Sequence, residues 1–472
     1  MPIDLNGPVP IDPKDPGVRN MLENLQGNIL KGHGRDHTAH IFIRLNGADA
    51  PTERARLGAV ARRVVTTARK QHRESGQFRD FGIPGSLFGN IFLTPGGYRA
   101  LGFGAEMEAE LTEPYFLDGM IARGGEFNDP APADWDEGYR GGDIHAMILL
   151  ADDDEGFLLR EARKLVNELE EFSTVLVVER GNALRTDSGE GIEHFGYVDG
   201  RSQPIYLTTD LFDKDGKSLE GSTDKWNPVE KLKIVLVPDR LAGEAEDAFG
   251  SYFVFRKLEQ DVRRFKIREE QLADELKLKG EERERAGAMA VGRFEDGTPL
   301  TLSQTDGFIP VKENNFTYAD DTNGLKCPFH AHIRKSNPRG DTTRKFGVPE
   351  EAERSHRVTR RGITYGERNR HPDAFQALED LPTEDVGLLF MCFQSSIENQ
   401  FAFIQRSWVN ETDFLNPDTG LDPVIGQGPS SEQHWPVSWG GFGTQDFDFS
   451  GFVKLKGGEF FFAPSIPFLR LL

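Results

Sequence analysis

Two histidines lie one residue apart in the segment KCPFHAHIRKSNPRG, residues 326–340. Imidazole nitrogens bind transition metals and haem iron, so His330 and His332 have a clear chemical use. Pro328 fits the first turn of a helix and the later Asn-Pro step would end one, which predicts a short helix over residues 329–336. Side chains two positions apart on a helix point about 200° away from each other. One metal ion could then bind only one of these histidines.

Three uses of the histidine pair remain open from the local pattern. On a strand, both rings would share a face, and Cys327 could join them in a zinc site if a fourth ligand completed a tetrahedron. One histidine could instead be the axial ligand of a haem iron. There is no Cys-x-x-Cys-His segment, so such a haem would not be held through two thioethers. Both histidines could also be ordinary surface or core residues.

Two further segments carry charged residues that suit acid–base chemistry. HFGYVDGRSQPIY (194–206) holds Asp199 within Gly-x-x-Asp-Gly, and VTRRGITYG (358–366) sets Arg360 and Arg361 before a glycine. A carboxylate can move a proton between two substrate atoms, and a guanidinium beside it keeps it ionised. Each segment alone is a weak signal, because Asp-Gly marks ordinary turns and paired arginines also fit a solvated turn.

Apolar periodicity predicts the elements that must position these residues. In the first half, the alternating or continuous apolar runs predict strands, and the runs with helical spacing predict helices. The expected strands are 39–45, 90–95, 144–153 and 173–180, and the expected helices are 54–70 and 155–172. This β-α-β-β-α-β order is the ferredoxin-like pattern.

The second half repeats the same pattern. Its expected strands are 251–258, 386–393 and 457–464, and its expected helices are 259–285 and 397–408. We therefore predict an α+β fold of two ferredoxin-like halves, each an antiparallel sheet with flanking helices. The polar, turn-rich segment 208–228 predicts the boundary, with an N-terminal domain of residues 1–215 and a C-terminal domain of residues 216–472. Residues 305–375 show little periodicity, and a long irregular segment in a compact domain is more often functional than idle.

Composition narrows the possible partners. The chain has 472 residues and a formal net charge of −21, and such a surface repels phosphate backbones and anionic lipids. We expect neither nucleic acid nor a membrane as a partner, since no run approaches the roughly 20 apolar residues of a membrane helix. The two cysteines and the proline- and acid-rich N-terminus, which does not resemble a signal peptide, predict a cytoplasmic protein, with export by another route left open.

Taken together and in this order, FGYVDGRSQP, CPFHAHIRKSNPR, RRGITYG and GLLFMCFQSS closely resemble the dye-decolorizing peroxidase family. LQGNILKGHG, PGGYRALGF, FRKLEQDV and FIQRSW also look like family segments, so the resemblance spans nearly the whole chain. It implies a haem peroxidase of two ferredoxin-like halves, with one non-covalent haem b per chain bound mainly by the C-terminal half.

The resemblance also implies roles for the charged residues. His332 would be the proximal ligand of the haem iron, whereas His330 stands where the family usually has alanine. Asp199 would lie over the opposite haem face, with Arg360 as its partner and Arg361 as the second choice.

Further residues take roles by the same resemblance. Leu388 and Phe390 would roof the distal pocket, and strand alternation independently puts them on one face. Arg334 would meet a haem propionate, because a buried carboxylate favours a guanidinium partner. Asp422, in GLDPVIG, would accept the N–H of His332 and raise its electron donation.

The expected function is reduction of hydrogen peroxide coupled to one-electron oxidation of bulky aromatic substrates, such as anthraquinone-type dyes and phenols. Tyr365 and Trp408 resemble positions from which the family passes electrons at its surface. Trp435 and Trp439 are further aromatic residues that no motif favours. The alternative is a non-catalytic haem carrier or sensor, which would have little need for a carboxylate with an arginine beside it. The sequence assigns no oligomeric state.

Overall fold

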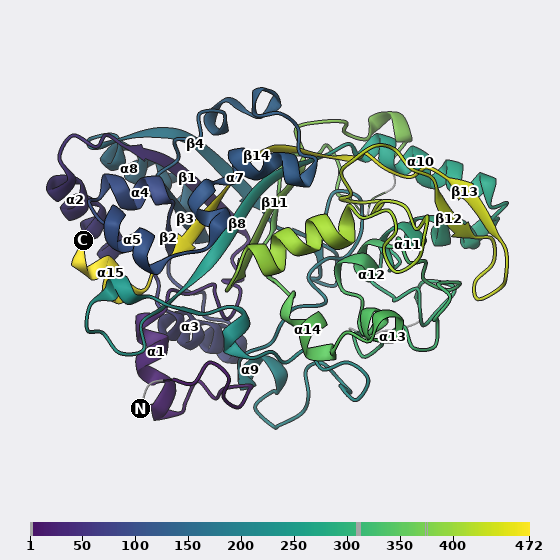
Figure 1. Cartoon of the computed structure of the whole chain (residues 1–472), viewed down its shortest axis with the longest axis horizontal. Coiled ribbons are helices and arrows are strands. Elements are labelled where there is room, and N and C mark those ends of the chain that lie inside the picture. The colour runs from purple at the N-terminus through teal and green to yellow at the C-terminus, as the bar shows by residue number, and fades with distance from the viewer. Residues whose placement is uncertain (1–2, 308–312, 373, 375) are drawn as a thin grey trace.

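The computed structural model describes residues 3–307, 313–372, 374 and 376–472 (Figure 1). An antiparallel sheet forms its centre, in the order β10-β11-β8-β14-β2-β3-β1-β4. The first half of the chain supplies β1 (His37–Leu45), β2 (Phe88–Leu93), β3 (Ala146–Asp152) and β4 (Ser173–Asn182). The second half supplies β8 (Phe249–Gln260), β10 (Ile363–Tyr365), β11 (Gly387–Gln394) and β14 (Val453–Ala463).

Both halves have the same strand order. Numbered within each half, the strands lie side by side as second, third, first and fourth, which gives β2-β3-β1-β4 and β10-β11-β8-β14. A β-α-β-β-α-β chain produces this antiparallel arrangement in ferredoxin-like folds. The predicted α+β class and its two ferredoxin-like halves are therefore confirmed. The strands lie on either side of residues 215 and 216, but the domain boundary itself stays a prediction.

The two halves meet at both edges of their sheets. On one side, β14 pairs with β2 through Phe462 and Leu93. On the other side, the Thr364 hydroxyl of β10 donates a hydrogen bond to the Asn182 carbonyl of β4. A Cβ atom at Gly181 would lie 2.4 Å from the Ile363 side chain, so glycine permits this close approach. The sheet thus curves until its first and last strands are neighbours.

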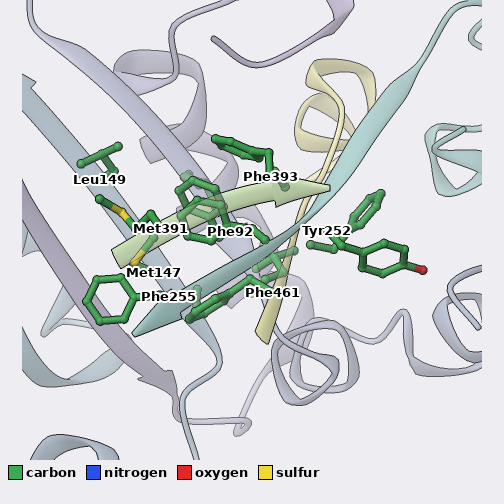
Figure 2. Close-up of a cluster of buried hydrophobic side chains, with 14 of the residues drawn as sticks. Phe92, Met147, Leu149, Tyr252, Phe255, Met391, Phe393 and Phe461 are labelled. Atoms are coloured by element: carbon green, nitrogen blue, oxygen red, sulfur yellow. The ribbon is translucent and has the colours of Figure 1, made fainter. Parts of the chain in front are cut away.

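The buried core on the sheet is built largely from phenylalanine side chains that both halves contribute (Figure 2). The rings of Phe92 and Phe253 stack with centroids 4.2 Å apart, and Phe393 lies 4.7 Å from Phe253. Phe255 and Phe461 extend the cluster (Figure 2). Full burial of one such side chain stabilises the fold by about 1.5–3 kcal/mol, with about 0.5–1.5 kcal/mol more for an aromatic pair. This shared core holds the two halves together.

Helices cover the sheet, and two of the predicted helices prove to be interrupted. The predicted helix 54–70 is two helices, α2 (Ala50–Val64) and α3 (Ala68–Phe81). The chain between them is extended, and the Thr67 side chain caps α3 by accepting the N–H of Lys70. Apolar residues continue at helical spacing across this break, so periodicity alone could not reveal it.

The predicted helix 259–285 was too long for a similar reason. Helix α10 (Val262–Glu275) ends before Lys277, whose φ of 59° lies in the left-handed region. Helix α11 (Glu284–Val291) then begins separately. The helix predicted at 155–172 is α8 (Glu155–Leu169), and that at 397–408 consists of π-helical turns at Glu398–Ala402 and Ile404–Val409.

Shorter elements complete the chain. Three short helices occupy the region that lacks periodicity, α12 (His332–Ser336), α13 (Asp341–Phe346) and α14 (Glu350–Ser355). The remaining short helices are α1 (Arg19–Asn24), α4 (Pro95–Ala100), α5 (Gly104–Glu110), α6 (Pro114–Asp118), α7 (Met120–Arg123), α9 (Thr208–Leu211) and α15 (Ile466–Leu471). The short strands are β5 (Leu184–Arg185), β6 (Gly191–Ile192), β7 (Val237–Pro238), β9 (Thr359–Arg360), β12 (Gln433–Pro436) and β13 (Thr444–Phe447). Across the described ranges, none of the helices has both the length and the apolar character needed to cross a membrane.

Candidate active site

A cavity of about 1940 Å³, its open mouth included, lies against the C-terminal half of the sheet. It brings together five of the residues singled out in the sequence, although they come from distant segments: Asp199, His332, Arg360, Leu388 and Phe390. A cavity with apolar walls and a few converging polar groups is the usual form of a ligand or cofactor site.

The sheet supplies the apolar wall of the cavity. Leu388 of β11 is directly opposite Leu258 of β8, which is in turn opposite Leu455 of β14. Two residues further along β11, Phe390 is opposite Arg256. Side chains two apart on a strand share a face, so Leu388 and Phe390 face the cavity together, as predicted.

His332 enters the cavity from the first turn of α12, with its ring held by Asp422. Nδ1 lies 2.8 Å from Asp422 Oδ2, and the buried carboxylate also accepts the backbone N–H groups of Val424 and Ile425 through Oδ1. An ionised Asp422 accepts a hydrogen bond, so Nδ1 carries the proton and Nε2 keeps its lone pair. Burial would lower the pKa of His332, but Asp422 outweighs burial and raises it. Asp422 therefore has the position that we expected.

His330 does not share the cavity, but the reason differs from the one that we predicted. The helix begins at His332, and His330 lies in the turn before it, where the Ala331 N–H donates to Pro328 O. The His330 ring is buried, with its centroid 4.3 Å from that of Trp435. Burial lowers its pKa well below the usual value, which keeps it neutral. Backbone placement, not the divergence of side chains along one helix, separates the two histidines.

The zinc interpretation receives no support from the geometry. The Cys327 thiol is buried, and burial raises its pKa to about 12, so it is not a ready thiolate ligand. Within the part of the chain that the structure describes, no group of three or more His, Cys, Asp or Glu side chains is arranged to hold a metal ion. His332 faces the cavity as a single imidazole.

Asp199 and Arg360 form an ion pair in the cavity wall. Arg360 Nη1 donates to Asp199 Oδ1 at 3.0 Å, and its Nη2 donates to the carbonyl of Ser202. The Gln203 side chain accepts the backbone N–H of Arg360. Burial would raise the pKa of Asp199, but Arg360 and the Gly200 backbone N–H outweigh burial and lower it. Asp199 is therefore ionised at neutral pH and can accept a proton.

Glu193 organises the turn that presents Asp199, although no sequence motif had singled it out. Its carboxylate accepts the N–H groups of Phe195 at 2.8 Å and Tyr197 at 3.2 Å, and Gln260 donates to it at 2.6 Å. Burial raises the pKa of Glu193 to about 7. Its place just before the Gly-x-x-Asp-Gly turn was the signal that could have identified it, because carboxylates often accept the N–H groups of a following turn.

The structure corrects the role of Arg334. Its side chain is fully buried and away from the cavity lining. Nε and Nη2 donate to the Asp341 carboxylate. Nη1 donates to the Asp321 carboxylate and to the Cys327 carbonyl, and Nη2 also donates to the Asp321 carbonyl. These contacts use all five N–H donors of the guanidinium. Arg334 therefore fixes the local fold and has no donor left for a propionate.

Two other arginines, Arg339 and Arg293, lie in the cavity wall as buried guanidinium groups that could pair with a propionate, the role expected of Arg334. Arg339 and Arg293 are buried and hydrogen-bond to carbonyl oxygens and to the Asn314 side chain. Neither has an acidic partner within 4.0 Å among the described residues. Burial lowers the pKa of Arg339 to about 9, which still leaves it charged at neutral pH. Among the described residues, Arg339 uses both Nη atoms, including bonds to the Phe316 carbonyl and the Ser202 hydroxyl, and keeps its Nε–H for an anionic ligand. Arg293 keeps its Nε–H and one Nη2–H.

Arg361 has a different function from Arg360. It donates to the carbonyls of Asn28 and Ile29, which fastens the N-terminal segment to the β9–β10 turn. A second cavity runs along this segment and shares Asp199, Arg360 and Leu388 with the first. The charged pair therefore lies between two cavities, whereas Arg361 lines only the second.

Tyr365 and Trp408 are not at the surface, contrary to our prediction. Each side chain is only 7% exposed, and neither lines the main cavity. The Tyr365 hydroxyl has no hydrogen-bond partner among the described residues, so no group there accepts its proton on oxidation. Trp408 packs against Phe403 and Phe414. Neither ring therefore offers a bulky substrate an exposed face.

Two family models match the chain. The DyP dimeric alpha+beta barrel domain matches residues 24–184, and the C-terminal domain of Dyp-type peroxidases matches residues 219–418. The first contains β1 to β4, and the second contains His332, Arg360, Leu388 and Phe390.

Individual proteins match over almost the whole chain. The multifunctional dye peroxidase DyP2 of an Amycolatopsis species is 43% identical, with 100% of each chain covered. The crystal structure of an Anabaena DyP-type peroxidase has a TM-score of 0.91 at 41% identity, covering 99% of this chain and 98% of that one. A dye-decolorizing peroxidase in complex with 2,6-dimethoxyphenol has a TM-score of 0.76 at 28% identity, covering 95% and 98%.

Proposed function

Because this chain belongs to the dye-decolorizing peroxidase family, with haem as the cofactor of its peroxidase chemistry, we propose that its main cavity holds one non-covalent haem b ligated by His332. One observation carries this proposal: a single cavity contains both His332, which is hydrogen-bonded to Asp422, and the Asp199–Arg360 ion pair. A non-catalytic haem carrier would have no use for that second pair.

The residues that line the cavity fit a haem. Its macrocycle is flat and apolar, which suits the three adjacent leucines on the sheet, Leu388, Leu258 and Leu455. Its iron takes an imidazole nitrogen such as His332 Nε2. Its two propionates are carboxylates, which suit the two buried guanidinium groups of Arg339 and Arg293. A buried cation without a counter-charge is costly, and propionates would supply that charge.

When bound, haem supplies an iron that can take peroxide as a ligand and accept its oxidising equivalents. The chain supplies the proton transfers. The Asp199 carboxylate accepts a proton from one peroxide oxygen and returns it to the other, so that water leaves instead of hydroxide. Arg360 keeps Asp199 ionised before the transfer and stabilises the negative charge that develops on the departing oxygen.

We propose hydrogen peroxide and aromatic reductants, including phenols and anthraquinone-type dyes, as the substrates. The relative solved with 2,6-dimethoxyphenol supports the phenolic class. Asp199 and Arg360 also line the second cavity, which we propose as the entry route for hydrogen peroxide. We also propose a cytoplasmic location, which the two free, buried cysteines support.

A direct assay tests the proposed function. The purified protein should have the intense absorption band of a haem at the violet edge of the visible range, and this band should change on adding hydrogen peroxide. Peroxide-dependent oxidation of 2,6-dimethoxyphenol and of an anthraquinone dye should follow. A haem spectrum that peroxide does not change would identify a haem carrier instead.

Replacing Arg339 with leucine should speed the release of haem. A hydrogen bond to a charged group contributes about 1.5–3 kcal/mol, so the affinity for haem should fall roughly tenfold to a hundredfold. Haem transfer to an excess of an apo-globin acceptor measures this. Arg361→Leu is the matched control, because Arg361 is a half-buried arginine that is also bonded to carbonyls but lines only the second cavity. Equal release from both variants would contradict the assignment to a propionate.

Replacing Arg360 with leucine should move the acid limit of the peroxide reaction to higher pH. Asp199 acts as a base only when ionised, so the rate falls as the pH falls through its pKa. Burial raises that pKa and Arg360 lowers it, so removing Arg360 should raise the pKa. Stopped-flow absorbance between pH 3 and pH 7 (about the range of carboxyl titration) measures the shift. Arg360→Lys keeps the charge and should shift the limit less, and an unmoved limit in Arg360→Leu would refute the pairing.

A further inference from the structure

Lys335 is a fully buried lysine one helical turn after His332, and its nearest carboxylates, those of Asp422 and Glu411, act on it through their charge without direct contact. Its ammonium group donates to two backbone carbonyls, Glu411 O and Gly420 O, each at 2.7 Å. The ring centroid of Phe414 lies 5.5 Å from Nζ. No Asp or Glu oxygen in the described residues lies within 4.0 Å of Nζ. Burying a cation without a counter-charge is unfavourable, so its two carbonyl contacts must hold it in place.

The two carbonyls lie at the two ends of one loop, residues 411–420. The loop closes on itself, because the Gly420 N–H donates to Thr412 O at 2.8 Å. It follows the π-helical turn Ile404–Val409, and Asp422 comes two residues after its end. Lys335 therefore joins α12 to both ends of the loop, next to the residue that binds His332.

Asp422 has few other restraints on its backbone. Its N–H donates to Val409 O at 3.1 Å, and its carbonyl accepts the N–H of Gly426 at 3.0 Å. These bonds fix Asp422 relative to its own segment, but not relative to α12. Three hydrogen bonds tie residues 411–422 to α12 in the part of the chain that the structure describes. One is the His332–Asp422 bond itself, and Lys335 makes the other two.

We infer that Lys335 is a positioning residue that holds the loop 411–420 against α12 and thereby sets the hydrogen bond between Asp422 and His332. This inference rests on the proposed role of His332 as the haem ligand. A strong hydrogen bond to Nδ1 gives the imidazole partial negative charge, which strengthens its bond to iron and stabilises the ferric state. Lys335 would thus tune the iron through two intervening residues without contacting the haem.

The test uses full-length holoprotein and two readouts other than activity. In Lys335→Met, which keeps the length of the side chain but loses its N–H donors, the Fe–His stretching frequency of the ferrous protein should fall. The Fe(III)/Fe(II) reduction potential should rise. Asp422→Asn sets the expected direction of both changes, because it weakens the same hydrogen bond directly. Resonance Raman spectroscopy and spectroelectrochemistry measure the two quantities.

Lys345→Met is the matched control. Lys345 is exposed on α13 and donates to the Asn416 side chain in the middle of the same loop, at 2.8 Å. Losing that contact should leave both readouts at wild-type values. Wild-type values in Lys335→Met, with clear changes in Asp422→Asn, would overturn the inference. A wild-type protein without an Fe–His band would instead overturn the proposed role of His332.

A second variant keeps the test decisive if Lys335→Met does not fold. Lys335→Gln retains two N–H donors on an uncharged, slightly shorter side chain. If the carbonyl contacts position Asp422, this variant should give values between those of the wild type and Asp422→Asn. A Lys335→Gln holoprotein with wild-type values for both readouts would overturn the inference.

Discussion

Substitution of His332 by alanine is expected to yield a protein that does not retain haem. His332 is the one histidine that lines the main cavity within the described residues, and Asp422 holds its ring with Nε2 free. Loss of the ligand itself should exceed the roughly 10–100-fold loss of affinity that follows removal of a ligand's outer partner. The ratio of haem absorbance to protein absorbance, after purification and haem reconstitution, measures the effect.

His330→Ala is the control for that experiment. His330 packs against Trp435 and has no contact with the cavity, so its removal should lower the free energy of unfolding by about 1–3 kcal/mol and leave the haem spectrum nearly unchanged. Loss of haem from His330→Ala, with retention in His332→Ala, would reverse the assignment of the two histidines. Urea unfolding of both variants separates a loss of haem from a loss of folded protein.

Asp199→Ala is expected to retain haem but to react with hydrogen peroxide about 10²–10⁴-fold more slowly. The Asp199 carboxylate is ionised and lies in the cavity wall, paired with Arg360, where it can accept and return a proton. Alanine removes the base and leaves His332 and its partner Asp422 unchanged. Stopped-flow absorbance at the main haem band, with peroxide in excess, measures the rate.

Asp199→Asn refines that experiment. The amide has nearly the shape of the carboxylate but cannot accept the proton as a base, so it should be as slow as alanine. Wild-type rates in both Asp199 variants would refute the proton-transfer role. A normal rate in Asp199→Asn alone would indicate that Asp199 acts through its shape and hydrogen bonds.

The fold could be predicted largely because periodicity reports burial. Apolar runs predicted the four main strands of the first half and β8, β11 and β14 of the second, and the similar order in both halves indicated two ferredoxin-like units. Strand β10 was missed, because three residues are too few to show a periodic pattern. Helix breaks were missed at Thr67 and Lys277, because one depends on a cap and the other on a left-handed residue. Neither feature interrupts the apolar pattern around it.

Site residues were predictable from the sequence where a motif fixes the backbone position. They were less predictable where the direction of a side chain depends on partners far away in the sequence. Asp199 lies in a turn whose two glycines, Gly196 and Gly200, have positive φ. Arg334 and Arg339 follow His332 within one short run, but Arg334 turns to the distant Asp321 and to Asp341. Arg339 lines the cavity from a left-handed conformation with φ 51°. No local pattern in that run distinguishes these two directions.

The position of β14 has a consequence for how the protein forms during synthesis. This strand lies between β8 and β2, and its backbone pairing with both makes the two halves one hydrogen-bonded sheet (Figure 1). A ribosome delivers it after every other named strand, and pairing between segments so distant in sequence is slow. The first half must therefore wait with the edge of β2 uncovered, a time when strand-to-strand aggregation competes with folding. Chaperone demand should accordingly be greatest before residues 453–463 emerge.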